Sequence, residues 1–174
     1  METNIHQNIT NWLSVNAYAM MASWKWKSGG NAITYDTYSG EVLKQYAIYC
    51  DGLHVGDAPQ TQLGLQLNVV KKGWYVNADC HYNARMYADF EPASRVSSDK
   101  SDAYKLPSHA IVDATTGYKF AVYKVDLNIF ATVRNLMGTQ YIERGIDGSN
   151  HDQDTFKGYW GMPRQFSFGL VVKL

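Results

Sequence analysis

The chain has 174 residues and a formal net charge of zero at pH 7, with 16 basic residues balancing 16 acidic ones. Without a basic excess or a run of lysine and arginine, nucleic acid is excluded as an expected partner. Aromatic residues make up 14% and prolines number only 4, which suits β-strands and membrane–water interfaces. No stretch approaches the roughly 18 consecutive apolar residues that a transmembrane helix needs.

The first strand is predicted over residues 10–27. The segment before it, Met1–Asn8, has neither the basic nor the apolar region of a signal peptide. Within the strand, apolar residues occupy every second position, which is the period of a β-strand with one apolar face. These alternating residues are Leu13, Val15, Ala17, Ala19 and Met21.

A long polar connection follows, from residue 27 to 59. Its two inner runs, 32–38 and 42–49, flank Ser39-Gly40 and predict a hairpin within the connection. Six aromatic residues here are candidates for ligand contact, because their rings can stack on sugars or hydrophobic chelates. An aromatic girdle at a membrane interface explains the two tryptophans equally well. The six are Trp24, Trp26, Tyr35, Tyr38, Tyr46 and Tyr49.

Two strands, 60–70 and 73–90, are predicted on either side of a tight turn at Lys71-Lys72-Gly73. The second has the clearest alternation in the chain, and its polar face needs water or a polar ligand along its whole length. That face could line a substrate path, or its charges could satisfy one another and solvent. Its candidate residues are Asp79, His81, Asn83, Arg85 and Tyr87.

Three further strands are predicted over 108–120, 125–142 and 161–174. The last strand ends the sequence on an apolar residue, and its apolar positions resemble the lipid-facing side of a terminal strand in an outer-membrane barrel. These positions are Phe166, Phe168, Leu170, Val172 and Leu174. A terminal strand of an ordinary soluble sheet is the alternative for this segment alone.

The connections alternate between long (27–59, 91–107, 143–158) and short (71–73, 121–124). Membrane barrels sort their connections in this way, with short turns on one side and long loops on the other. A set of about six strands is too small to close a membrane barrel, which starts at about eight. An open sheet would leave two edges unpaired in the bilayer, so the chain is predicted to be a segment of a larger barrel.

Four short motifs, in order, give the chain a family resemblance. Val133–Met137 with Thr139–Ile142, and Gly158–Leu170, are similar to the last two strands of TonB-dependent outer-membrane receptors. Asp51–Gln62 and Met86–Phe90 resemble receptors of the Bacteroides type. The resemblance covers essentially the whole chain.

The resemblance implies the last quarter or so of a plugged barrel of about 22 strands, an all-β antiparallel meander with the plug and the earlier strands absent. It implies a Gram-negative outer-membrane receptor that imports a siderophore, vitamin or glycan with energy from the TonB system. The implied partners are outer-membrane lipid, the remaining barrel and plug, the TonB complex through the absent part, and the barrel-assembly machinery. The family usually ends in Phe where this chain has Leu174.

No residue pattern indicates an enzyme, a cofactor or a metal site. The five histidines are scattered, and a hydrogen-bonded His81 is favoured over a metal ligand, as is a solvated loop at His151–Asp154. A disulfide between Cys50 and Cys80 is the less favoured interpretation. The alternative function is a self-contained small β-domain, soluble or on a surface, that binds a ligand without transport.

Overall fold

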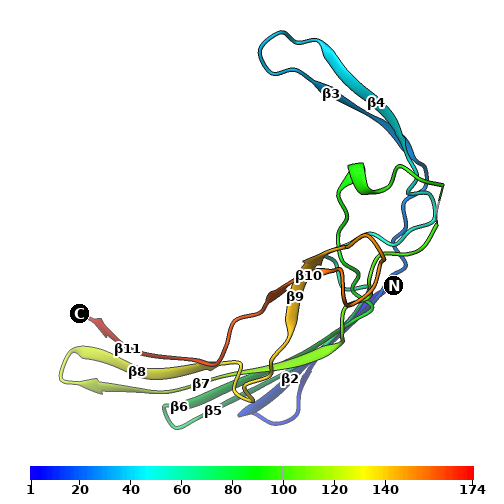
Figure 1. The fold of residues 1–174 in the computed structure, drawn as a ribbon. Coiled ribbons are helices and arrows are strands. Elements are labelled where there is room, and N and C mark those ends of the chain that lie inside the picture. The colour runs from blue at the N-terminus through cyan, green and yellow to red at the C-terminus, as the bar shows by residue number, and fades with distance from the viewer. Residues whose placement is uncertain (99) are drawn as a thin grey trace.

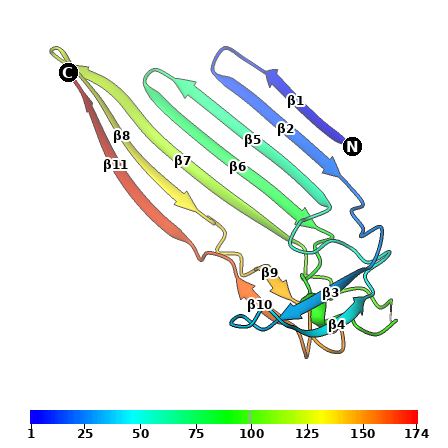
Figure 2. The ribbon, with the colours of Figure 1, turned by 90° about the horizontal axis from the view of Figure 1, so that it is seen from above.

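The main feature of the computed structural model, which describes residues 1–98 and 100–174, is an open seven-stranded antiparallel sheet. Apart from inserted hairpins, each strand pairs with the one before it, so the sheet is a meander (Figures 1 and 2). This confirms the predicted fold class. In sheet order the strands are β1 (Glu2–Asn8), β2 (Leu13–Met21), β5 (Thr61–Lys71), β6 (Trp74–Ala84), β7 (His109–Val122), β8 (Val125–Arg134) and β11 (Gln165–Lys173).

Two separate hairpins lie in the long connections. One pairs β3 (Gly30–Tyr35) with β4 (Val42–Ile48), which confirms the hairpin predicted around Ser39-Gly40. It projects away from the sheet at the loop end (Figure 1). The other pairs β9 (Ile142–Ile146) with β10 (Lys157–Trp160). The described residues include one short 3-10 helix, η1 (Pro92–Ser94), and no helix long and apolar enough to cross a membrane.

The short turns gather at one end of the sheet and the long connections at the other (Figure 2). The turn between β5 and β6 has two residues, Lys72 with a φ of 50° and Gly73 with a φ of 85°. Positive φ at both positions is the geometry of a type I′ hairpin turn, whose twist matches that of the strands. We call this edge, with the β1–β2 turn at 9–12 and the β7–β8 turn at 123–124, the turn end.

The strands differ from the predicted ones in number and length. β1 was not predicted, because Ile5 is its only apolar residue and its alternation is therefore weak. β6 ends at Ala84 and β8 at Arg134, short of the predicted 90 and 142. Each is followed by a left-handed residue, Arg85 with a φ of 52° and Asn135 with a φ of 51°, which interrupts a strand.

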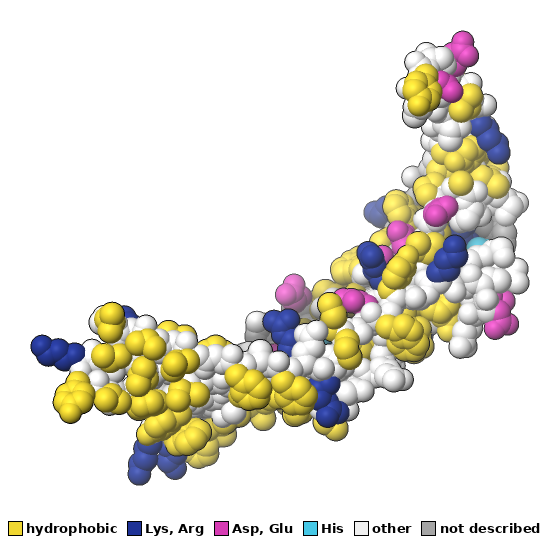
Figure 3. All heavy atoms as spheres, turned by 60° about the vertical axis from the view of Figure 1, so that its left-hand side comes forward, with side chains coloured by type: hydrophobic (Ala, Val, Ile, Leu, Met, Phe, Trp, Pro, Cys, Tyr) yellow, Lys and Arg dark blue, Asp and Glu magenta, His cyan; other side chains and the backbone are white. Residues whose placement is uncertain are grey.

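The sheet has two chemically different faces. Strand registers align the apolar positions of all seven strands on one side, which we call the outward face. Large apolar side chains on it remain exposed to a degree that a soluble core would not allow, with Leu65 at 45% and Phe168 at 82%. Figure 3 shows apolar side chains gathered over this part of the molecule. An apolar face that the chain itself leaves uncovered needs an apolar environment.

The buried hydrophobic residues of the described chain lie in the long connections instead, apart from Ile111 on β7. We call residues 22–60, 85–98, 100–108 and 135–164 the loop cluster. Cys50, Leu53 and Phe90 form one buried group. Met86, Ala88 and Leu106 form a second, against which residues of the third connection pack. The molecule's own hydrophobic core therefore holds the loops to one another and leaves the sheet without one.

Candidate functional site

The inward face of the sheet, opposite the apolar face, carries continuous rows of polar side chains. One row crosses every strand through successive registered pairs, and within it the Thr115 and Thr132 hydroxyls lie 3.0 Å apart. This regular placement follows from the two-residue side-chain period and the antiparallel register. The row consists of Asn8, Ser14, Asn68, Asn77, Thr115, Thr132 and Ser167.

A second row lies next to it, toward the loops. His6 contacts the Asn16 side chain, whose amide donates to Gln66 Oε1 at 2.8 Å. Gln66 pairs in turn with Asp79, and Asp79 with Asp113. His6, Asn16 and Gln66 share hydrogen bonds, and the side chains of this row remain at least partly exposed. The inward face can therefore bind water or a polar partner across the strands from β1 to β7.

Three aromatic rings of the inward face lie over glycines of the neighbouring strand. Tyr18 covers Gly64, Tyr75 covers Gly117, and Phe130 covers Gly169, in each case within a registered pair. A Cβ at Gly117 would lie 2.4 Å from the Tyr75 ring. The glycines therefore allow large rings to lie flat against a face that is otherwise lined by small polar groups.

The five candidates predicted on the strand after residue 73 do not form one line. Asp79, His81 and Asn83 do lie on the inward face, with His81 Nδ1 3.5 Å from Asp79 Oδ1. Arg85 instead turns back, and its guanidinium donates to Thr61 Oγ1 at 2.6 Å and to a backbone carbonyl. Tyr87 lies beyond the end of β6 and belongs to the loop cluster.

Tyr87 stacks on the His54 ring with a centroid distance of 4.2 Å. His54 contacts the Asp102 carboxylate through its ring and its backbone N–H, the latter at 2.9 Å. Burial raises the pKa of the Tyr87 phenol, and the Asp102 charge adds to this. Tyr87 thus joins the first long connection to the second and lies outside the polar rows.

The six aromatic candidates of the first connection are also separated. Trp24 is fixed at the base of the loops, where its backbone N–H and C=O bond the buried Gln60 side chain at 3.2 and 3.1 Å. Trp26 lies against Phe90, with ring centroids 6.2 Å apart. Tyr35 and Tyr46 lie on different strands of the β3–β4 hairpin and are not registered partners, since Tyr35 pairs with Val42 and Tyr46 with Ala32.

The remaining two aromatic candidates are Tyr38, fully exposed in the hairpin turn, and Tyr49, whose backbone N–H donates to the Arg95 carbonyl at 2.7 Å. The structure therefore gives no single aromatic surface. The terminal apolar set lies where the sequence placed it, on β11 and the residue after it, with exposures of 63% for Phe166, 61% for Leu170, 53% for Val172 and 98% for Leu174.

Sequence reasoning missed a buried ionic group that joins the long connections. Arg95 and Asp147 form an ion pair at 2.7 Å, and their side chains are 2% and 1% exposed. Asp147 also accepts from the Tyr104 backbone N–H at 3.0 Å, and His151 Nδ1 lies 2.6 Å from it. Arg95 and Asp147 lie 52 residues apart in the sequence and match no motif, so no sequence signal indicated their pairing.

A small polar cleft of about 200 Å³ opens in the loop cluster. It is lined by Asp57, Asp89 and Arg144, with Gly145, Ile146 and Tyr159. The Arg144 guanidinium lies 5.0 Å from the Tyr159 ring centroid. Burial raises the pKa of Asp57, and the neighbouring Asp89 charge raises it further. The cleft can bind a polar group through charge and hydrogen bonds, although pockets for whole small ligands are usually larger, at about 300–1,000 Å³.

Other candidate chemistry is limited. In the part of the chain that the structure describes, no three His, Cys, Asp or Glu side chains come close enough to hold a metal ion. Cys50 and Cys80 are both free thiols, Cys50 buried with its Sγ 3.2 Å from the Ser28 carbonyl. The chemically distinctive surfaces are therefore the inward polar rows, the cleft and the outward apolar face.

Comparison with known proteins shows the fold. The sequence matches no protein-family profile. The structure is similar to the crystal structure of the siderophore receptor PiuA from Acinetobacter baumannii, with a TM-score of 0.61 at 18% sequence identity over 98% of this chain. A second similar structure is the ferric-catecholate import receptor Fiu from K12 E. coli, at 15% identity and a TM-score of 0.44. This chain spans 21% of the first and 26% of the second.

Proposed function

We propose that this chain is part of the wall of an outer-membrane receptor that binds and imports a scarce nutrient with energy from the TonB system. The observation that carries the proposal is the division of the sheet into two faces across all seven strands. Lipid is the environment that an exposed apolar face such as that of Leu65 and Phe168 requires, and a polar lumen suits the opposite side.

The arrangement of the connections supports the same proposal. Short turns on one edge and long packed loops on the other are the arrangement of outer-membrane barrels, whose loops face outside. The similarity to about a fifth of a siderophore receptor fits a segment of such a barrel. Among siderophore, vitamin and glycan, the name of that neighbour favours a siderophore as the nutrient. The Bacteroides type rests on the sequence motifs alone.

In this proposal the inward rows around Asn77 and Asp79 face the lumen and the plug, and the small cleft at Asp57 and Asp89 faces incoming ligand. The two unpaired edges, on β1 and β11, pair with the rest of the barrel, because open edges are not tolerated in a bilayer. TonB contact belongs to the absent part. The terminal segment Phe166–Leu174 engages the assembly machinery.

The test is to locate the native polypeptide in cells. An antibody raised against the long connection 27–59 should detect, in the outer-membrane fraction, a protein several times heavier than the 19.7 kDa of this chain. The reading frame upstream of the Met1 codon should continue into a plug-like segment. A 19.7 kDa band in the soluble fraction, with a stop codon just upstream, would favour the self-contained β-domain and contradict the proposal.

A further inference from the structure

The turn end carries lysines without acidic partners. Lys71 closes β5, Lys72 lies in the turn after it, and Lys124 lies in the turn between β7 and β8. All three side chains are exposed. None of the ion pairs found among residues 1–98 and 100–174 involves them. The nearby Asp126 is on the inward face, where it pairs in register with Lys173.

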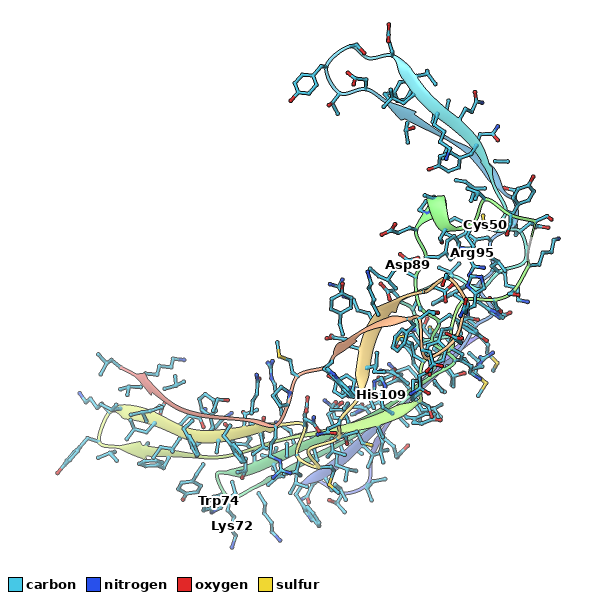
Figure 4. All side chains as sticks on the ribbon, in the orientation of Figure 1. Cys50, Lys72, Trp74, Asp89, Arg95 and His109 are labelled. Atoms are coloured by element: carbon cyan, nitrogen blue, oxygen red, sulfur yellow. The ribbon has the colours of Figure 1, made fainter. Side chains whose placement is uncertain are left out.

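Aromatic rings lie directly beside these lysines. Lys71 Nζ is 5.3 Å from the Trp12 ring centroid. The Trp74 ring lies 4.7 Å from that of Tyr118 and is 58% exposed, and Tyr123 is fully exposed at the tip of its turn. In Figure 4, Lys72 and Trp74 lie together at the turn end, on the convex side of the sheet. Tryptophan and tyrosine favour the boundary between hydrocarbon and polar headgroups.

The two ends of the molecule differ in their acidic side chains. On the face seen in Figure 3, acidic and basic side chains both lie over the loops and the hairpin, whereas only basic ones are seen at the far end of the sheet. Lysines with long apolar stems, placed where an apolar face ends, can extend their ammonium groups to the headgroup level. Negatively charged headgroups at that level complement the lysine ammonium groups, and salt screens the attraction only weakly when the two charges lie within a Debye length of each other.

We infer that the turn end binds anionic phospholipid headgroups, with Lys71, Lys72 and Lys124 on the phosphates and Trp12 and Trp74 at the hydrocarbon boundary. The inference rests on the proposed function, which places lipid against the outward face. It adds the class of lipid and its position. The occupant is an anionic glycerophospholipid such as phosphatidylglycerol, because three exposed lysines that form no ion pair among the described residues meet an apolar face at this edge.

The test compares binding of the full chain to two kinds of vesicle by co-flotation after dilution from urea. One vesicle is pure phosphatidylcholine and the other contains phosphatidylglycerol as well. The variant Lys71→Gln/Lys72→Gln/Lys124→Gln removes the three charges. A matched control, Lys25→Gln/Lys27→Gln/Lys44→Gln, removes three lysines from the loop end, and Lys71→Arg/Lys72→Arg/Lys124→Arg keeps the charge.

Binding of the unchanged chain to the anionic vesicles should be stronger by a factor on the order of ten or more, since each basic residue near such a surface adds attraction. The turn-end glutamine variant should lose this preference, while the loop control and the arginine variant keep it. Added inorganic phosphate should not compete, because the site needs a headgroup anchored at the hydrocarbon boundary.

Equal binding of the unchanged chain to both vesicles would overturn the inference and leave the membrane function standing. So would a loop control that loses as much preference as the turn-end variant, because net charge would then explain the effect. Competition by free phosphate would replace the lipid with a soluble anion as the ligand. Binding to neither vesicle would also overturn the inference, while the proposed function is decided separately by where the native polypeptide is found in cells.

Discussion

The sheet and the loop cluster are stabilised in opposite ways. The sheet is regular, its neighbouring strands are paired in continuous register, and it has no hydrophobic cluster of its own, so large apolar residues such as Leu65 and Phe168 are exposed. The loop cluster is irregular, yet it contains every buried hydrophobic residue of the described chain except Ile111, including Leu53, Ala88 and Leu106. The regular part therefore depends on its surroundings, and the irregular part carries its own packing. Lipid should stabilise the first and leave the second nearly unchanged.

The largest effect is expected from Asp147→Ala in the loop cluster. It leaves the Arg95 guanidinium buried without its partner, which costs about 3–5 kcal/mol for a buried pair. Hydrogen exchange of the Ala88 and Leu106 backbone amides, which bond the Tyr104 and Met86 carbonyls, should accelerate strongly. Amides of the β5–β6 ladder should keep their protection in lipid.

The control for this prediction is Asp154→Ala, which removes an exposed carboxylate from the same connection and should leave exchange unchanged. If Asp147→Ala exposed the Leu65 amide as much as that of Ala88, loops and sheet would open as one unit. The sheet and the loop cluster would then not be stabilised independently of each other.

The second prediction concerns the outward face. Leu67→Arg places a charge in the middle of β5 on the side assigned to lipid, which costs about 2–4 kcal/mol at the bilayer midplane. Its neighbour Gln66 faces inward, so Gln66→Arg should cost much less. Protease protection of the chain assembled in vesicles measures the difference. Equal loss of protection for both variants would mean that the two faces are not distinguished by lipid.

The third prediction concerns the inward face. Gly117→Val brings a side chain against the Tyr75 ring, where the first added atom would lie 2.4 Å from it. Overpacking of this kind costs typically about 1–3 kcal/mol. The urea midpoint of the assembled sheet should fall, and Tyr75→Ala in the same chain should recover most of the loss. Failure of the second substitution to compensate would show that the ring and the glycine do not meet.

The regular elements of the fold were predictable from the sequence where their pattern is local or periodic. Alternation predicted the strands that carry Leu13–Met21 and Phe166–Val172 because a two-residue period is visible in the residues themselves. It missed Glu2–Asn8, because this strand contains a single apolar residue and shows no alternation of its own. The hairpin around Ser39-Gly40 was predictable because its turn residues are local.

The loop cluster was not predictable in the same way. Arg95, Asp147 and His151 meet through irregular backbone, with partners chosen by packing and without any periodic pattern. Arg85 and Tyr87 were placed on the polar face because strand periodicity was extended past Ala84, where a left-handed residue ends it. Periodicity predicts which face a strand residue occupies, but it does not show where the strand stops.

The smallest effect is expected from Asp57→Asn, and its pH dependence tests how self-contained the loop cluster is. Burial raises the pKa of Asp57, and the Asp89 charge adds to this, so the folded loops favour the protonated acid. The stability that this group contributes is present below its unfolded pKa and is lost as the pH rises through its higher folded value. Asparagine is neutral throughout, so Asp57→Asn should protect the Asp147 amide slightly more than the unchanged chain at neutral pH. At neutral pH the difference should be roughly within 0.5 kcal/mol because the site is partly solvated, and the two chains should converge in acid.

The control Asp36→Asn should act in the opposite sense and lower protection at neutral pH, because backbone N–H groups lower the pKa of Asp36 and favour its charged form. Greater protection of the unchanged chain at neutral pH would contradict this prediction, because it would show that the folded loops stabilise the charged Asp57 carboxylate. A cation bound in the cleft from outside the loop cluster would have that effect.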